Sequence, residues 1–265
     1  MNRKTQLSVS VLTDNVPGKD YLSEHGLSFF IEFSGKKVLF DTGQSDVFLR
    51  NASLMGLSLH NRDLIILSHG HFDHGNGLSY LEGGRLLCHP GCFVKRYRAS
   101  DMSYIGLGNS RNELQKKFDL ITSAVPFSVG ERIVFLGEVP RNTAFESKNT
   151  SFVLEGGEPD FVMDDSGVAL LHDEGLFVIT GCGHAGVVNT LEHARKVTGE
   201  KRLFGIMGGF HLKQVDRQTV ETVEYLKTNG VKHVLPSHCT AQPALEAFYK
   251  QFGKHTVRTG EVYRF

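Results

Sequence analysis

The sequence predicts an α/β fold of four layers, in which two β-sheets pack face to face and helices cover their outer faces. Two observations and one packing argument support this prediction. The first 85 or so residues consist mostly of short apolar runs bounded by Gly, Asp, Asn or Pro, which is typical of strands. The last 90 or so alternate between strand-like and helix-like patterns. Two such halves, each with a sheet covered on one face, would bury their sheets against each other.

The expected strands are rich in Val, Ile, Leu and Phe. They span residues 7–13, 28–32, 37–41, 64–68, 85–88, 132–136, 151–154, 168–171, 176–180, 203–207 and 233–236. Helical patterns cover residues 46–55, 186–198, 216–229 and 241–252. In the third of these, Val220, Val223 and Leu226 recur at helical spacing, and Asn229-Gly230 provides a stop signal.

Length and composition indicate one globular domain. The chain has 265 residues, of which 40% are apolar and 22% charged, so it can bury a sizeable core. No linker rich in Pro, Gly and Ser separates the halves, so we expect a single domain over residues 1–265. Residues 94–129 show the weakest pattern, and we interpret them as a candidate insertion that covers the functional site.

Charge and hydropathy argue against several classes of protein. The formal net charge is zero, which disfavours a nucleic-acid-binding protein. The basic cluster Lys95, Arg96 and Arg98 is expected on a solvated face, with contact to an anionic substrate as the alternative. No apolar run approaches the roughly 20 residues that span a bilayer, and Met1–Ser10 lacks the apolar core of a secretory signal. We therefore expect a cytoplasmic protein without a membrane partner, whose four cysteines are reduced thiols.

The strongest chemical signal is the run HGHFDH at residues 69–74, directly after an apolar strand. Residues two apart in an extended chain face the same side, so His69 and His71 can bind one metal ion together. Asp73 and His74 follow at a point where nearby glycines allow the backbone to leave the extended conformation, so they can turn toward a second ion. Imidazole and carboxylate ligands suit zinc, manganese or iron. A polar histidine-rich loop is the alternative, but four ligand-type residues in six positions argue against it.

Such a run indicates catalysis rather than a structural metal. A structural zinc site is closed by four protein ligands, whereas two adjacent, partly filled sites leave room for water. A bound water with a pKa near 7 supplies hydroxide at neutral pH, and a metal pair can hold both the attacking and the leaving oxygen. In this interpretation Asp73 is both a ligand and a proton acceptor.

The HxHxDH pattern resembles the metallo-β-lactamase fold superfamily, and further matches extend over most of the chain. Residues 38–43 (VLFDTG) look like the first motif, which implies that Asp41 buttresses the metal loop. Residues 176–181 (LFVITG) look like the strand that normally ends in a metal-bridging aspartate. Residues 234–238 (VLPSH) look like the last motif, which implies that His238 binds the second metal. The order of these motifs implies the four-layer αββα sandwich.

The chain departs from that family at two positions. Cys182 follows residue 181 where the family usually has aspartate; its thiolate could still bind zinc, or it could be a small buried residue. The usual third histidine of the first metal site is missing from residues 160–166. His184 is the better substitute, since it follows Cys182 at the site end of the strand; its alternative is a residue at the start of the next helix. His172 is expected at the wrong end, because a five-residue strand is roughly 16 Å long.

The ends of the strands also sort the remaining histidines. His211 follows strand 203–207 and His238 follows strand 233–236, so both are expected to face the site. His211 could position the substrate or protonate its leaving group.

Several motifs resemble one branch of the superfamily, described as 7,8-dihydropterin-6-ylmethyl-4-(β-D-ribofuranosyl)aminobenzene 5′-phosphate synthase-like proteins. They are residues 24–28 (EHGLS), 181–186 (GCGHAG), 208–212 (GGFHL) and 236–240 (PSHCT). This resemblance implies pterin or phosphate-ester chemistry. Residues 137–141 also resemble the branch, and Arg141 could hold a phosphate by two parallel bonds. The alternative for Arg141 is a salt bridge to Glu138 or Glu146.

Three functions are compatible with these features. The first is a hydrolase that uses one or two ions of zinc, manganese or iron to activate water against a small anionic substrate, such as a phosphoester or a pterin-linked phosphate. The second keeps the fold but makes a bond to a dihydropterin, as a synthase. The third is a non-enzymatic metal-bearing ligand sensor, supported by the absence of the bridging aspartate. The sequence carries no signal of oligomeric state.

Overall fold

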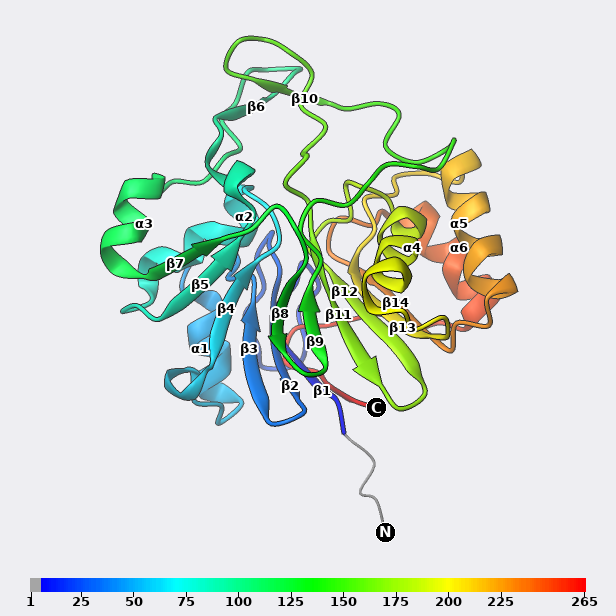
Figure 1. Cartoon of the computed structure of the whole chain (residues 1–265), viewed down its shortest axis with the longest axis horizontal. Helices are drawn as coiled ribbons and strands as arrows, with labels where there is room; N and C mark the ends of the chain where they lie inside the picture. The colour runs from blue at the N-terminus through cyan, green and yellow to red at the C-terminus, as the bar shows by residue number, and fades with distance from the viewer. Residues whose placement is uncertain (1–5) are drawn as a thin grey trace. The chain divides into compact units, whose positions relative to one another are not determined.

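The computed structural model describes residues 6–265, which fold as two compact units (Figure 1). Unit 1 comprises Val125–Asn149 and Asp165–Val257, and unit 2 comprises residues 6–124, Thr150–Asp164 and Arg258–Phe265. The expectation of a single domain stays a prediction. The expectation for Met1–Ser10 falls partly on residues 1–5, which lie outside the described residues. No helix within residues 6–265 is long and apolar enough to cross a membrane.

The sheet of unit 2 has the strand order β15-β1-β2-β3-β4-β5-β7. These strands are β1 (Ser8–Thr13), β2 (Ser28–Phe33), β3 (Lys36–Phe40), β4 (Leu64–Leu67), β5 (Arg85–Cys88), β7 (Asp119–Thr122) and β15 (Val262–Arg264). The pairs from β3 to β7 are parallel. The carboxyl ends of β3, β4 and β5 therefore meet at one edge, where the sequence predicted the metal loop.

Helices and a small ribbon complete unit 2. The helices are α1 (Val47–Leu54), α2 (Phe72–Gly75) and α3 (Arg111–Lys117), with 3-10 turns η1 (Leu59–Asn61), η2 (Asn76–Tyr80) and η3 (Pro90–Phe93). Phe48 of α1 and Leu114 of α3 belong to the same buried cluster as Leu39 and Ile65 of the sheet. The strands β6 (Arg96–Arg98) and β10 (Phe152–Leu154) pair with each other outside the large sheet (Figure 1).

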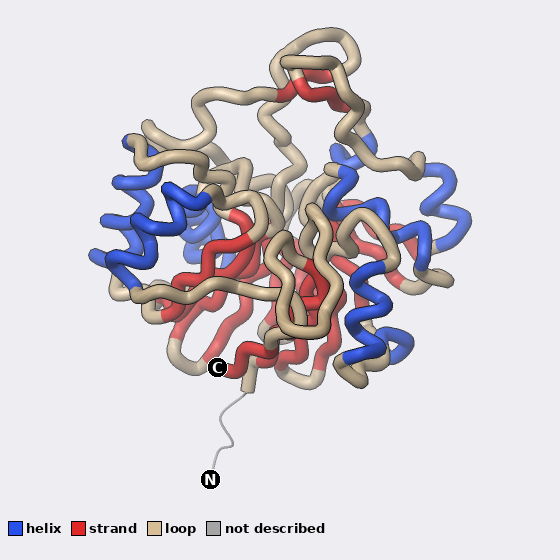
Figure 2. The backbone as a smooth tube through the Cα atoms, turned by 180° about the vertical axis from the view of Figure 1, so that it is seen from behind, coloured by secondary structure: helices blue, strands red, loops and turns tan. Residues whose placement is uncertain are grey.

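The sheet of unit 1 has the strand order β14-β13-β12-β11-β9-β8. Its elements are β8 (Phe127–Gly130), β9 (Ile133–Phe135), β11 (Gly167–His172), β12 (Gly175–Thr180), α4 (Val187–Thr198), β13 (Leu203–Gly209), α5 (Arg217–Thr228), β14 (His233–Ser237) and α6 (Gln242–Phe252). Leu191, Leu226 and Phe248 anchor the helices in a core shared with the sheet. Within each unit the helices, drawn in blue, lie outside the red strands (Figure 2). Strands β12, β13 and β14 are parallel, so their carboxyl ends share one edge.

Every strand and helix expected from the sequence is found, with ends that differ by one or two residues. The helices and strands that were not expected are α2, β6, α3, β7, β8 and β15. Most of them lie in the vaguely patterned residues 94–129. There β7 extends the sheet of unit 2, while α3 begins with a capping box in which Ser110 and Glu113 bond to each other's backbone.

Candidate metal centre

The run at residues 69–74 is placed by the end of β4. Leu64–Leu67 is fully buried, and the chain then turns through Ser68 and Gly70 into the single turn of α2. A Cβ at Gly70 would lie 2.0 Å from the carbonyl oxygen of Cys92, so this position requires glycine. Close packing of the loop thus brings the ligand-type side chains out at the edge of the sheet.

His69 and His71 point ring nitrogens at each other. His69 Nε2 lies 3.0 Å from His71 Nδ1, and His69 Nδ1 lies 2.8 Å from Ser68 Oγ. Two nitrogens each about 2.1 Å from one ion and 3.0 Å apart would subtend an angle of about 90° at that ion. Burial, with the nearby His74 and His71, holds the pKa of His69 well below its ordinary value. His69 is therefore neutral at pH 7, as a metal ligand must be.

Asp41 organises the same loop from the end of β3. Its buried carboxylate accepts hydrogen bonds from the backbone N–H and the hydroxyl of Ser68 and from Nδ1 of His74, each at 2.7 Å. Nε2 of His74 is then the nitrogen available to a metal, and it lies 3.9 Å from Asp73 Oδ2. These contacts are those expected of a residue that orients a metal-binding histidine. Asp41 also adopts a left-handed φ of 56°, a conformation that non-glycine residues rarely take.

His25 is a contact of Asp73 that the sequence analysis did not assign to the site. Its Nε2 lies 3.1 Å from Asp73 Oδ2, and its Nδ1 lies 3.3 Å from Asn15 Nδ2. Because Asn15 Oδ1 accepts the N–H of Gly26, the amide nitrogen must be the group that faces His25. His25 Nδ1 is then an acceptor, so Nε2 carries the proton and donates it to Asp73. The signal available in the sequence was the position of His25 inside the motif at residues 24–28.

Asp160 and Asp164 lie in the stretch 160–166, where the expected third histidine is missing, and their contacts support the metal loop. Asp164 accepts the N–H of Gly70 through one carboxylate oxygen and pairs with Arg96 through the other, both at 2.7 Å. Arg96 Nε also lies 3.3 Å from Asp160 Oδ2. The expectation of a solvated face is wrong for Arg96, whose side chain is 1% exposed. Burial disfavours its charge, but Asp164 and Asp160 outweigh that effect and raise its pKa.

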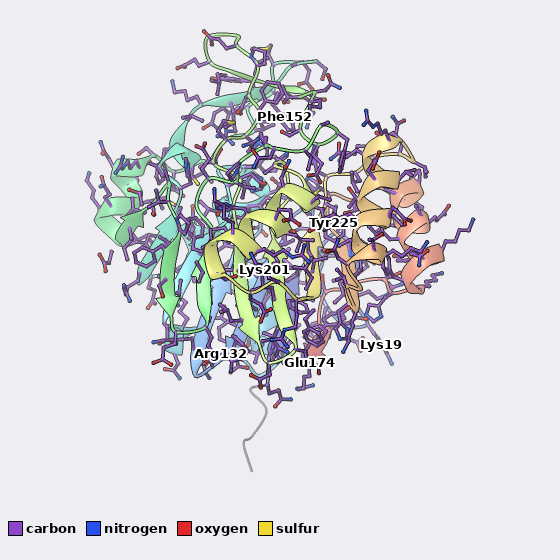
Figure 3. The ribbon with its side chains drawn as sticks, turned by 45° about the vertical axis from the view of Figure 1, so that its right-hand side comes forward. Lys19, Arg132, Phe152, Glu174, Lys201 and Tyr225 are labelled. Atoms are coloured by element: carbon purple, nitrogen blue, oxygen red, sulfur yellow. The ribbon has the colours of Figure 1, made fainter. Side chains whose placement is uncertain are left out.

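Part of the segment 94–129 runs along the metal loop within unit 2. Gly106 forms a β-bridge with His71, and Phe72 donates its N–H to the carbonyl of Ile105 at 3.1 Å. Phe152 lies in the β6–β10 ribbon (Figure 3). Its ring packs edge-on to His71 with centroids 5.1 Å apart. These contacts shield one side of His71.

In unit 1 the loop after β12 carries Cys182 and His184. Cys182 is buried and His184 is half-buried. Two carboxylates hold the loop and the helix that follows it. Asp165 accepts the N–H of Ala185, and Glu146 accepts those of Val188 and Asn189 at the start of α4, each at 2.8 Å.

His211 and His238 each follow the end of a parallel strand, as predicted. Both have left-handed backbones, with φ of 49° and 51°. Such conformations cost of the order of 1 kcal/mol and recur at functional sites. The rings of His184 and His211 lie 4.2 Å apart. The donor atoms of Cys182, His211 and Cys239 lie within 4.8 Å of one another.

Other sequence predictions concern residues away from these loops. Arg141 donates from Nε to Ser147 Oγ at 3.0 Å and from Nη1 to the carbonyl of Val139 at 3.2 Å. Its role as an anion clamp stays a prediction. His172 pairs with Gly175, at the end of β12 opposite to Cys182, and stacks on Phe204. Arg132 and Glu174, labelled in Figure 3, mark the same end of this sheet.

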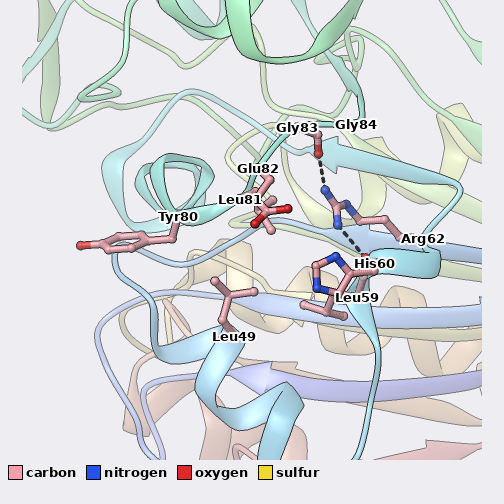
Figure 4. A pocket seen from close by; sticks show the side chains of 9 residues that line it. All are labelled: Leu49, Leu59, His60, Arg62, Tyr80, Leu81, Glu82, Gly83 and Gly84. Atoms are coloured by element: carbon pink, nitrogen blue, oxygen red, sulfur yellow. Dashed lines mark hydrogen bonds between the residues drawn. The ribbon is translucent and has the colours of Figure 1, made fainter.

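A cavity of about 510 Å³ lies elsewhere in unit 2 (Figure 4). It is lined by Leu49, Leu59, His60, Arg62, Tyr80, Leu81, Glu82, Gly83 and Gly84. Arg62 crosses it and donates to the carbonyl oxygens of Leu59 and Gly83. These residues do not overlap with the predicted metal ligands.

Comparisons with known proteins agree with this geometry. The family model described as the metallo-beta-lactamase superfamily matches residues 24–84. Two proteins of Methanocaldococcus jannaschii are similar over most of their length. "Uncharacterized protein MJ0448" is 34% identical over 89% of this chain and 92% of its own. "7,8-dihydropterin-6-methyl-4-(beta-D-ribofuranosyl)-aminobenzene-5'-phosphate synthase" is 31% identical over 92% of this chain and 91% of its own.

A solved structure extends the likeness to the whole fold. Tm1679, described as a metal-dependent hydrolase of the beta-lactamase superfamily, superposes with a TM-score of 0.85. It is 31% identical and covers 97% of this chain and 98% of its own. The mixed α/β fold with two sheets flanked by helices is thereby confirmed. The chain belongs to the metallo-beta-lactamase superfamily and is a metal-dependent enzyme of that superfamily.

Proposed function

We propose that this chain is a hydrolase that uses one or two divalent metal ions to cleave a small anionic substrate, a phosphoester or a pterin-linked phosphate. The observation that carries the proposal is the paired geometry of His69 and His71, whose ring nitrogens lie 3.0 Å apart. The proposed ligands are His69, His71, Asp73 and His74 in unit 2 and Cys182, His184 and His238 in unit 1. His238 is assigned by its match to the last superfamily motif. Cys182 and His184 are assigned by their position after β12, where the chain departs from the family pattern.

The side chains of this chain would divide the chemistry among them. A divalent metal lowers the pKa of a bound water and so supplies hydroxide at neutral pH. Asp73 would accept a proton while His25 keeps its carboxylate oriented through the 3.1 Å contact. Asp41 would hold His74 in the tautomer that leaves Nε2 to the metal. His211 would protonate the leaving group, and Arg141 would bind the anionic part of the substrate.

The experiment compares phosphodiester hydrolysis in the parent protein and two histidine variants. The parent protein, loaded with manganese or zinc, is expected to hydrolyse bis-p-nitrophenyl phosphate. His71→Ala should lower kcat/KM by about 100-fold or more. His172→Ala, at the end of β11 that pairs with the start of β12, should not change it. Circular dichroism checks that both variants are folded. A metal-loaded parent protein that turns over no phosphoester, lactone or amide in a broad panel would overturn the proposal.

A synthase is the second candidate function, because the Methanocaldococcus jannaschii relative that is 31% identical bears that name. The two candidates make different products. Incubation with a dihydropterin donor and an aminobenzene ribose phosphate acceptor, followed by mass spectrometry, should yield the joined product only if the chain is a synthase. Coupled product without any hydrolysis of phosphoesters would replace the first candidate by the second. Membership of an enzyme superfamily disfavours the sensor alternative.

A further inference from the structure

Two cysteines and a histidine converge within unit 1, and one of them, Cys239, has no role in the proposed reaction. Cys182, His211 and Cys239 follow the ends of β12, β13 and β14. Cys239 Sγ donates a hydrogen bond to the carbonyl of Cys182 at 3.3 Å. The donor atoms of all three residues lie within 4.8 Å of one another. The parallel order of the strands brings these loops to one edge of the sheet.

Gly209 makes this convergence possible. A Cβ at this position would lie 2.7 Å from Cys239 Sγ and 3.0 Å from the Cα of Cys182, so a larger residue would push the two cysteines away. Hydrogen bonds hold the neighbouring loops in place. Thr240 Oγ1 accepts the N–H of Phe210 at 3.1 Å, and Lys213 bonds to the carbonyl of Cys239 at 3.1 Å. The close approach at Gly209 and these hydrogen bonds therefore hold the two cysteines near each other.

The chemistry of the donors selects a class of ion. Two thiolates and an imidazole suit zinc and similar ions, whereas manganese and calcium prefer oxygen. Zinc–sulfur bonds of about 2.3 Å in a tetrahedral site place two sulfurs about 3.8 Å apart. The upper bound of 4.8 Å on the donor separations therefore exceeds tetrahedral spacing by only about 1 Å.

We propose that Cys182, Cys239 and His211 form a soft-metal site within unit 1, which binds a zinc-type ion without the histidines of unit 2. The site shares Cys182 with the catalytic ligands proposed above and uses His211 as a ligand. An ion bound there would occupy His211 and withdraw it from proton donation. Zinc added in excess of the catalytic ions is therefore expected to inhibit turnover.

The test uses cobalt(II) as a probe of the reduced full-length protein. Cobalt bound to thiolate absorbs in the near ultraviolet, so the band reports sulfur ligation independently of catalysis. The double variant His69→Ala/His71→Ala removes the first metal pair of unit 2. This variant should still bind about one cobalt per chain with the thiolate band, because the three proposed ligands remain. Hydrolysis is measured separately, so loss of activity alone does not affect the outcome.

Further substitutions in that double variant identify the sulfurs. Cys239→Ser should weaken cobalt binding by at least tenfold and reduce the band, and His211→Ala should weaken binding to a similar extent. The matched control Cys88→Ala/Cys92→Ala removes the two buried cysteines of unit 2 and should leave the band unchanged. Circular dichroism checks that each variant is folded. If Cys239→Ser does not fold, the result for His211→Ala decides the test. A band that vanishes with the unit 2 histidines, or that persists unchanged without Cys239 or His211, would overturn the proposal.

Discussion

The two units present their metal-binding residues in different ways. Unit 2 offers four candidate ligands from one run of six residues, at the end of β4. Unit 1 offers its candidates from separate loops, after β12, β13 and β14. Both sets are held by buried carboxylates. Asp41 and Asp164 hold the loop of unit 2, while Asp165 and Glu146 hold the loop and helix start of unit 1.

Asp164 and Asp165 make the comparison sharpest, because neighbouring residues serve different units. Asp164 holds Gly70 beside the histidine run, and Asp165 holds Ala185 beside His184. They differ in charge balance, since Asp164 also neutralises the buried Arg96. The loop that carries the ligand run at residues 69–74 is thus held by the buried ion pair of Asp164 and Arg96, and Asp164 lies far from that run in the sequence.

The largest expected effect comes from removing that ion pair. Asp164→Ala should lower the free energy of unfolding by about 3–5 kcal/mol, because it leaves the Arg96 charge buried without its closest partner. Asp165→Ala should cost less, about 1–3 kcal/mol, because it leaves the Ala185 N–H without its acceptor. Urea unfolding measures both. Equal costs for the two variants would show that the contrast between the units is wrong.

Next in size is the effect of Asp41 on metal affinity. Asp41→Asn replaces one acceptor oxygen by a donor. The Ser68 N–H on one oxygen and the Ser68 hydroxyl and His74 on the other can then no longer all be satisfied. We expect metal affinity to fall about 10- to 100-fold, measured by competition with a chelator. Asp63→Asn, at the opposite end of β4, is the matched control and should keep the parent affinity. If both variants bind metal equally well, Asp41 does not orient the ligands.

A smaller effect is expected at His25. His25→Ala should lower kcat by roughly tenfold with little change in KM or metal content, because Asp73 loses the donor that orients it. His25→Gln can still donate a hydrogen bond and should recover part of the rate. Asn15→Asp replaces the donor that faces Nδ1 by an acceptor and should resemble His25→Ala. Steady-state kinetics decide, and an unchanged kcat in His25→Ala would exclude the positioning role.

The smallest effect concerns the pH dependence of unit 1. Burial raises the pKa of Glu146, against the opposing N–H donors of Val188 and Asn189. The unfolded chain therefore releases this proton more readily, so stability falls as pH rises from about 4.5 through the raised pKa. Glu146→Gln has no titrating group at this position, so its free energy of unfolding should not fall over that pH window. Its stability should therefore rise relative to that of the parent, as measured by urea unfolding at several pH values. The exposed Glu246→Gln in α6 is the control and should show no such gain.

Most of the secondary structure could be predicted from local patterns. The runs of Val, Ile, Leu and Phe located the expected strands, and the run at residues 69–74 located the metal loop. The start of helix α3 could also have been predicted, since Ser110 and Glu113 have the spacing of a capping box. The burial of Arg96 could not have been predicted, because a charged side chain is expected to be exposed unless its partners are known. Asp160 and Asp164 are more than sixty residues away along the chain.

The sequence by itself determined the types of ligand and their positions at strand ends, because strand periodicity and residue chemistry are local properties. Tertiary structure alone decided which atoms can act. Asp41 lies 33 residues from His74, and their contact at Nδ1 leaves Nε2 as the nitrogen that would face a metal. Gly209 brings Cys239 to Cys182 across 57 residues. Such contacts depend on how the strands assemble, so spacing along one chain cannot reveal them.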